Sequence, residues 1–172
     1  ADFKSLQVVW LNGEVVSGSL KEQALAVLPA PARLFNTYSI CEAHDVCTVE
    51  LKSFPSDASK VCSVGLPMIG VKVRVLPESS LDLATDGIGE LYIGGLGLAS
   101  GYLEMAEMNQ QKFVHIDEER YYASGDLAEI DARGMVTVIG RNDSMVKIRG
   151  YTVYLAGIEE ILKKHCDVLD AA

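Results

Sequence analysis

The first part of the chain alternates between short apolar runs and one amphipathic segment. An apolar run over residues 6–11 ends in an Asn-Gly pair, the pattern of a buried strand followed by a turn. Ser19 and Glu22 then have the spacing of a capping box, and apolar residues follow at helical spacing until Pro29 ends the helix. A second strand is predicted over residues 33–37. This strand–helix–strand order predicts an α/β fold with two parallel neighbouring strands.

Most of the remaining pattern predicts β-structure. Residues 71–75 alternate apolar and charged side chains, as expected for a strand with one solvated face. A hairpin is expected around residues 131–134, where a glycine is free to adopt positive φ. A last helix carries Ile158, Ile161 and Leu162 on one face. Further elements are expected over residues 90–93 (strand), 105–113 (short helix), 126–130 and 135–139 (the hairpin strands) and 145–149 (strand).

The composition bounds the class of protein. Of the 172 residues, 49% are apolar and 23% are charged, which are globular proportions and exclude intrinsic disorder and collagen-like repeats. The 15 Lys and Arg against 24 Asp and Glu give a net charge of -9, which disfavours non-specific binding to nucleic acid or to an anionic membrane. No apolar run approaches the roughly 20 residues that a membrane-spanning helix needs.

The N-terminus and the cysteines indicate a cellular setting. The chain begins at Ala1 without an initiator Met and without a secretory signal, so we expect a fragment or a processed product. The four cysteines are too sparse for a disulfide scaffold. We therefore expect a reducing, cytoplasmic setting.

Two short patterns invite a chemical interpretation that their spacing does not support. Residues 94–101 are glycine-rich, but their G-x-G-x-x-x-G spacing differs from the G-x-G-x-x-G of a dinucleotide-binding loop, and turn glycines explain it as well. Cys41, His44 and Cys47 stand three residues apart but lack a fourth ligand at the spacing of a zinc motif. Buried or half-buried thiols are therefore the favoured interpretation.

Four longer segments are more informative than any single residue. They are NTYSICE at residues 36–42, GELYIGGLGLASGYL at 89–103, YASGDL at 122–127 and GRNDSMVKIRG at 140–150. In order, spacing and wording they resemble the N-x-Y-G-x-T-E, G-E-L-x-I-G-G-x-G-x-A-x-G-Y-L, Y-x-T-G-D-L and G-R-x-D-x-x-V-K-I-R-G patterns of the adenylate-forming superfamily. That superfamily comprises nonribosomal-peptide adenylation domains, acyl-CoA synthetases and luciferases. The V-K-I-R-G residues are most similar to the form that this motif takes in the peptide-synthetase branch.

The resemblance implies a reaction and the residues that carry it. Enzymes of this family join a carboxylate to ATP, forming an acyl-adenylate and pyrophosphate, and then pass the acyl group to a thiol. Glu42 stands at the family's magnesium position, which implies Mg²⁺ as a cofactor beside ATP. Asp126 stands where the family's aspartate accepts hydrogen bonds from the ribose hydroxyls, and Arg141 where a guanidinium contacts the nucleotide. Glu42 and Arg141 are thus the implied catalytic residues, and Tyr38 and Cys41 are implied members of the nucleotide site.

The resemblance carries the substrate pocket over only in part. By similarity to the peptide-synthetase pattern, the pocket would be lined by Trp10, Asn12, Thr37, Asp45 and Val46. A buried Asp45 carboxylate would need a partner, which an ammonium group on the substrate would supply. A solvated loop aspartate is an equally open interpretation of Asp45.

The chain departs from the family pattern in places that matter for chemistry. Ser39 and Cys41 replace the glycine and the threonine of Y-G-x-T-E, which puts the phosphate-side hydrogen bond of that threonine in question. The sequence contains neither a Ser/Thr/Gly-rich phosphate loop ending in lysine nor the family's late catalytic lysine. We therefore expect the chain alone to lack adenylation activity, since both features stabilise charge in the transition state.

These observations predict an α/β fold in three parts. Residues 1–62 would end a large α/β subdomain, residues 63–142 would form a small β-barrel-like subdomain, and residues 143–172 would begin an α+β C-terminal subdomain. The resemblance places Asp143 at the hinge about which that subdomain rotates, and a short polar connector does lie there.

The function that we predict is that of an internal piece of an amino-acid-activating adenylation domain. The partners would be a small carboxylic or amino acid, the phosphopantetheine thiol of a carrier protein domain, and the rest of the parent adenylation domain. One alternative is a non-catalytic relative that serves as a binding or assembly module and covers its apolar faces by self-association. Another is an acyl-CoA synthetase, with coenzyme A as the acceptor.

Overall fold

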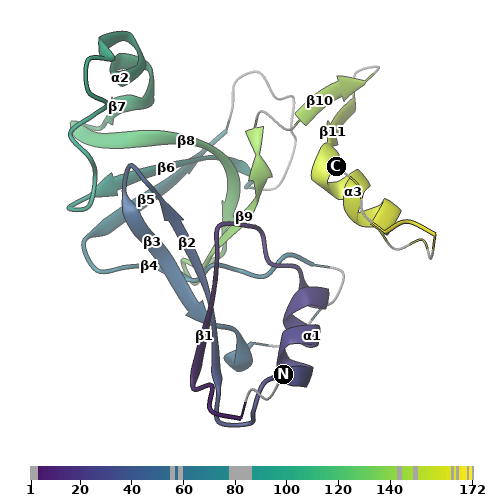
Figure 1. Ribbon diagram of the computed structural model, residues 1–172. Coiled ribbons are helices and arrows are strands. Elements are labelled where there is room, and N and C mark those ends of the chain that lie inside the picture. The colour runs from purple at the N-terminus through teal and green to yellow at the C-terminus, as the bar shows by residue number, and fades with distance from the viewer. Residues whose placement is uncertain are drawn as a thin grey trace.

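Two β-sheets form the body of the molecule (Figure 1). The computed structural model describes residues 4–54, 57, 60–77, 87–142, 145–148, 151–163, 165, 167–169 and 171. The first sheet has the strand order β1-β2-β3-β4. Its strands are β1 (Val8–Asn12), β2 (Arg33–Ile40), β3 (His44–Glu50) and β4 (Leu66–Pro67), joined in part by helix α1 (Gly18–Val27) and by the short 3-10 helix η1 (Leu51–Ser53).

The predicted strand–helix–strand unit is confirmed, although its helix begins earlier than the sequence suggested. β1 and β2 pair in parallel across the connection through α1. The N-cap of α1 is Ser17, whose hydroxyl accepts a hydrogen bond from the Leu20 amide at 3.1 Å. The predicted capping box of Ser19 and Glu22 is therefore wrong, because both residues already lie inside the helix. Ser17 satisfies one of the amide groups that a helix N-terminus leaves without an intrahelical partner.

The second sheet is antiparallel and strongly curved. Its strand order is β5-β6-β8-β7. The long strand β8 is curved: its first part pairs with β7 and its last part pairs with β9 (Figure 1). The elements are β5 (Val71–Leu76), β6 (Gly89–Gly95), α2 (Ala106–Lys112), β7 (Phe113–Ile116), β8 (Glu119–Ile130) and β9 (Val136–Arg141). The predicted hairpin is confirmed: β8 turns into β9 at residues 131–134, with Gly134 at φ +82°.

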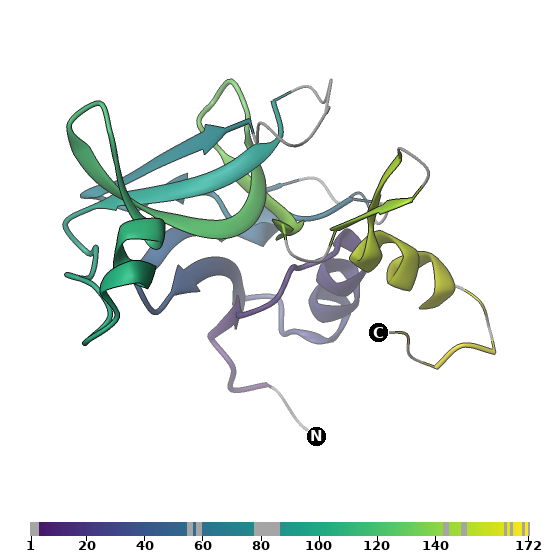
Figure 2. The same ribbon diagram turned by 90° about the horizontal axis from the view of Figure 1, so that it is seen from above.

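The main hydrophobic core lies where the two sheets stack on each other. Figure 2 shows the second sheet lying over the first. Fully or almost fully buried side chains come from both, namely Ala43, Val46, Cys47, Val64, Leu91, Ile93, Ala128, Val136 and Val138. A smaller cluster of Val16, Leu34 and Leu51 packs beneath α1. One face of the first sheet is thus covered by α1 near one end and by the second sheet near the other.

Beyond β9 the chain forms a small unit of its own. β10 (Met145–Ile148) and β11 (Tyr151–Tyr154) form an antiparallel hairpin, followed by helix α3 (Leu155–Lys163). The predicted strand and last helix are confirmed, and β11 is an addition. The apolar stripe of α3 is open to solvent, since Ile158, Ile161 and Leu162 are all exposed.

The sequence did not predict β3, nor the short strands β4, β7 and β11. β3 follows β2 after a three-residue turn and contains His44 and Cys47 of the Cys-His-Cys pattern, whereas Cys41 lies on the turn. The predicted helix over residues 105–113 ends at Lys112, and Phe113 begins β7 instead. The mixed architecture confirms the predicted α/β class. In the part of the chain that the structure describes, no helix has both the length and the apolar character needed to cross a membrane.

The buried Cys47 provides a direct test of the stacked sheets. Its side chain is fully buried, and this burial raises the pKa of the Cys47 thiol to about 12. Because the thiolate is the reactive form, we expect iodoacetamide at pH 8 to modify the exposed Cys41 but to leave Cys47 unmodified. Peptide mapping by mass spectrometry measures both sites in one experiment. Equal labelling of Cys47 without denaturant would contradict the packing of β3 against the second sheet.

Candidate functional site

A pocket of about 300 Å³ opens at the carboxyl ends of β1 and β2. Ligands of α/β sheets commonly bind outside this edge of parallel strands. Here the second sheet supplies the opposite wall through β8 and β9. The pocket brings together five residues that the sequence singled out, which are Asn12, Thr37, Tyr38, Asp126 and Arg141.

A β-bulge positions Asp126 in this pocket. Tyr92 pairs with Ala123 and Glu90 with Leu127, so three residues of β8 stand opposite one residue of β6. Within the bulge, Gly125 adopts φ +75° and donates its amide to the Glu90 carboxylate at 3.0 Å. A bulge of this kind changes the direction of a side chain, which explains how a strand residue points its carboxylate into the pocket.

Ser124 holds the bulge in place. Its hydroxyl donates to the Leu91 carbonyl at 2.7 Å and accepts from the Asp126 amide at 3.0 Å. Since Ser124 is itself buried, these bonds satisfy polar groups that would otherwise be costly inside the fold. The conformation around Asp126 is therefore fixed by the protein before any ligand binds.

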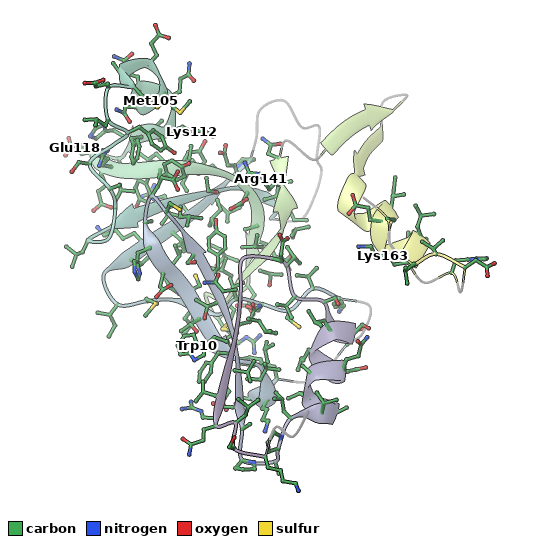
Figure 3. All side chains as sticks on the ribbon, in the orientation of Figure 1. Trp10, Met105, Lys112, Glu118, Arg141 and Lys163 are labelled. Atoms are coloured by element: carbon green, nitrogen blue, oxygen red, sulfur yellow. The ribbon has the colours of Figure 1, made fainter. Side chains whose placement is uncertain are left out.

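Asp126 is a nearly buried carboxylate with one phenol and one guanidinium beside it. Tyr38 donates its hydroxyl to Oδ2, and Nη1 of Arg141 lies 3.6 Å from Oδ1. Burial, together with the neighbouring Asp126 charge, raises the pKa of Tyr38 well above its ordinary value, so that its hydroxyl remains a donor. Arg141 is half exposed at the end of β9 and lines the pocket (Figure 3).

A second carboxylate, Glu42, lies on the turn between β2 and β3. Its Oε1 accepts a hydrogen bond from Tyr102 and another from Tyr122 at 3.1 Å. The two hydroxyls also lie 3.0 Å from each other. Two similar tyrosine–carboxylate hydrogen bonds therefore connect the two sheets. Tyr38 of β2 donates to Asp126 of β8, and Tyr122 of β8 donates to Glu42 just beyond β2.

Four of the five residues predicted for the acid pocket lie on one face of the first sheet. Trp10 pairs with Phe35 and Asn12 with Thr37 in the register of β1 and β2. Paired residues of neighbouring strands point to the same side, and the Trp10 and Phe35 rings stack at 5.0 Å. Asp45 pairs with Ser39, two residues beyond Thr37, and so joins the same face. This face lies opposite the hydrophobic core, and Trp10 is 59% exposed at its edge (Figure 3).

The fifth residue, Val46, lies on the other side of the sheet. The register of β2 and β3 shifts between Tyr38 and Ser39, which leaves Val46 as the extra residue of a bulge. Its side chain is fully buried in the core between the two sheets. The structure therefore separates Val46 from Trp10, Asn12, Thr37 and Asp45.

The remaining predicted residues lie apart from the pocket or outside the described part of the chain. Cys41 is exposed on the turn beside Glu42. His44 and Cys41 are exposed whereas Cys47 is buried, so the three side chains do not converge. Among the described residues, no group of three or more His, Cys, Asp or Glu side chains could hold a metal ion. The predicted hinge residue Asp143 lies outside the described residues.

Sequence reasoning missed the two tyrosines that bind Glu42. Tyr102 and Tyr122 both stand inside segments that the sequence had singled out, at 89–103 and 122–127. Within a single sequence, nothing indicates that residues separated by 60 and 80 positions from Glu42 share its carboxylate. The contact arises only in the folded structure, where the β2–β3 turn packs on β8.

Comparison with known proteins agrees with this geometry. The family model described as AMP-binding enzyme matches residues 1–103. The chain is 34% identical over 178 residues to glycine betaine reductase ATRR of Emericella nidulans, covering 100% of this chain and 14% of the relative. It is 37% identical over 171 residues to novobiocin biosynthesis protein H of Streptomyces niveus, covering 96% and 27%.

Solved structures give the same result. Klebsiella oxytoca NpsA in complex with 3-hydroxyanthranilyl-AMSN matches with a TM-score of 0.77 and 26% identity, over 95% of this chain and 34% of NpsA. PA1221, a nonribosomal peptide synthetase protein containing adenylation and carrier domains, matches with a TM-score of 0.66 and 28% identity, over 97% and 34%. This chain belongs to the AMP-binding enzyme family, and its fold is that of part of an adenylation domain. It spans 14% and 27% of the two curated relatives and about a third of either solved structure.

Proposed function

We propose that this chain forms the nucleotide-binding and magnesium-binding part of an ATP-dependent enzyme that converts an amino or other carboxylic acid into an acyl-adenylate. The observation that carries the proposal is the Asp126 carboxylate, held by a bulge at the mouth of a pocket beside Tyr38 and Arg141. An ionised carboxylate has about four acceptor positions. A carboxylate held in this position would accept hydrogen bonds from the two ribose hydroxyls of the nucleotide.

Arg141 and Glu42 would act on the phosphate side of the nucleotide. The guanidinium of Arg141 presents a fixed fork of donors, which suits phosphate oxygens. The residues around Glu42 fit a magnesium ion: both described hydrogen bonds of the carboxylate go to Oε1, so within the described part of the chain Oε2 keeps its acceptor capacity. Mg²⁺ is commonly held by one or two carboxylates plus substrate phosphates and water. When bound, it would neutralise charge on the phosphate oxygens.

The open face of the first sheet would contribute to the site of the acid. Trp10, Asn12, Thr37 and Asp45 share this face, and Asn12 and Thr37 also line the nucleotide pocket. An acid bound there would therefore meet the nucleotide at the carboxyl end of β2. The Asp45 side chain is partly exposed, with its Oδ2 3.5 Å from Nδ1 of His44. Because it is partly exposed, an ammonium group of the substrate could reach and pair with it.

We further propose a carrier-protein thiol as the acyl acceptor. The support is that PA1221 combines adenylation and carrier domains in one protein. We also propose that the chain divides into subdomains after residues 62 and 142, with a hinge at Asp143. We propose further that the enzyme works in the cytoplasm and that the chain by itself is inactive.

The test uses the complete enzyme that contains this chain. It is incubated with ATP, Mg²⁺ and a panel of amino and aromatic acids, and acid-dependent pyrophosphate exchange is measured. We expect exchange with at least one acid, and acyl transfer to a phosphopantetheinylated carrier rather than to coenzyme A in a mass-spectrometric assay.

The 172-residue chain assayed alone is the matched control. Robust exchange by the isolated chain would contradict its expected inactivity. Acyl transfer to coenzyme A alone would favour the acyl-CoA synthetase. A complete enzyme that neither exchanges pyrophosphate nor binds AMP would be a non-catalytic binding or assembly module.

A further inference from the structure

Glu42 stands on an element that cannot orient its side chain by itself. It lies in the three-residue turn that joins β2 to β3, between Ile40 and His44. A glutamate on a turn has three side-chain torsions and would sample many positions. A carboxylate that must receive a metal ion at a fixed place performs better when other groups fix its orientation.

Two phenols provide such groups, Tyr122 from β8 and Tyr102 from the loop between β6 and α2. Tyr102 and Tyr122 both donate to Oε1 of Glu42, and their hydroxyl oxygens lie 3.0 Å apart. A phenol hydroxyl has one proton to donate, and both hydroxyls direct theirs at the same carboxylate oxygen. The backbone of Glu42 is also held, because its carbonyl accepts the Ala99 amide at 2.7 Å.

The phenols are themselves rigidly placed. Phe113 packs against both rings, with centroid distances of 5.7 Å to Tyr102 and 5.2 Å to Tyr122. The side chain of Asn109 clamps the backbone of Tyr102, accepting from its amide at 2.7 Å and donating to its carbonyl at 2.8 Å. Tyr122 lies within β8, paired on both sides by neighbouring strands. The two hydroxyls therefore form a fixed double donor.

We propose that Tyr102 and Tyr122 are positioning residues that fix Oε1 of Glu42 and thereby aim Oε2 at the metal ion. This inference rests on the proposed function, because it assumes that Glu42 binds a divalent cation. It goes beyond that function in assigning a role to two residues that would act through Glu42. The competing interpretation is that the phenols only tether the β2–β3 turn to the second sheet.

Binding of Mn²⁺ separates the two interpretations without relying on turnover. The complete enzyme is saturated with α,β-methylene ATP, which cannot form the adenylate, and free Mn²⁺ is followed by electron paramagnetic resonance. The variants are Tyr102→Phe, Tyr122→Phe and their combination, which keep the rings against Phe113 and remove only the hydroxyls. Tyr121→Phe is the matched control, since its hydroxyl donates to a different carboxylate, Glu119, at 3.2 Å. Glu42→Gln measures the effect of weakening the ligand itself.

We expect each single variant, Tyr102→Phe and Tyr122→Phe, to weaken Mn²⁺ binding about 10-fold, as the loss of an outer partner of a metal ligand commonly does. Tyr121→Phe should leave Mn²⁺ binding unchanged. The affinity for AMP, measured without metal, should be unchanged in all four tyrosine variants, which shows that the fold and the nucleotide site are intact.

Three results would overturn the proposal, and they have different consequences. If Glu42→Gln weakens Mn²⁺ binding while the tyrosine variants do not, the positioning role is wrong and the proposed function stands. If the tyrosine variants lose affinity for AMP to the same extent as for Mn²⁺, the phenols are a structural tether. If Glu42→Gln leaves Mn²⁺ binding unchanged, Glu42 is not the metal ligand, and both the positioning role and the magnesium assignment fail.

Discussion

Replacing Asp126 by alanine in the complete enzyme is expected to lower kcat/KM for pyrophosphate exchange by about 100-fold to 10,000-fold. Each hydrogen bond between the carboxylate and a ribose hydroxyl contributes about 1.5–3 kcal/mol, and two such bonds would be lost. A loss of about 1.4 kcal/mol corresponds to a tenfold change in rate. The effect should also be visible as a weaker affinity for AMP.

The control for this experiment must separate chemistry from folding, because Asp126 also binds Tyr38 and lies near Arg141. Asp126→Asn keeps the size of the side chain and removes the charge, and Glu129→Gln makes the corresponding change at an exposed position of the same strand. We expect Asp126→Asn to lose most of the exchange activity and Glu129→Gln to retain it. Wild-type kinetics in Asp126→Asn, with unchanged circular dichroism, would remove Asp126 from the nucleotide site.

Replacing Gly65 by alanine is expected to lower the free energy of unfolding of the chain by about 3 kcal/mol or more. Gly65 has φ +98°, and a Cβ atom at this position would lie 2.2 Å from the Thr48 carbonyl oxygen. The residue joins the two sheets, since its carbonyl accepts the Val136 amide at 2.9 Å. The backbone would therefore have to move at the junction, adding strain to the loss of that bond.

Gly140→Ala is the matched control, because a Cβ atom there meets no heavy atom within 4 Å. Urea denaturation followed by circular dichroism measures both variants. The control should match the wild type or exceed it slightly, since alanine restricts the unfolded chain. A loss of less than about 1 kcal/mol in Gly65→Ala would mean that the first sheet does not meet β9 as described.

The parts of the fold that the sequence predicted are those set by local pattern. The parallel pair β1 and β2 follows from two apolar runs around one helix, and the hairpin of β8 and β9 follows from its glycine-containing turn. The start of α1 was misplaced because Ser17 and Ser19 are both acceptable caps, and the structure selects Ser17. β3 was not predicted because the bulge at Val46 interrupts its pattern: Val46 and Cys47 are neighbours and both are buried.

The candidate site was predictable in its residues but not in its geometry. The resemblance supplied Asp126, Arg141 and Glu42, and the structure places the first two together. It did not reveal the bulge that aims Asp126, because the mismatch between β6 and β8 arises only when the two strands pair. The same holds for Val46, whose direction depends on a shift of register between β2 and β3.

The most direct test of the nucleotide site is a crystal structure of the complete enzyme with AMP. The ribose hydroxyl oxygens are expected at about 2.5–3.0 Å from the carboxylate oxygens of Asp126. The phosphate is expected on the side of Arg141 and Glu42. AMP bound elsewhere, with the pocket between β2 and β8 left empty, would contradict the assignment of Asp126 and with it the proposed function.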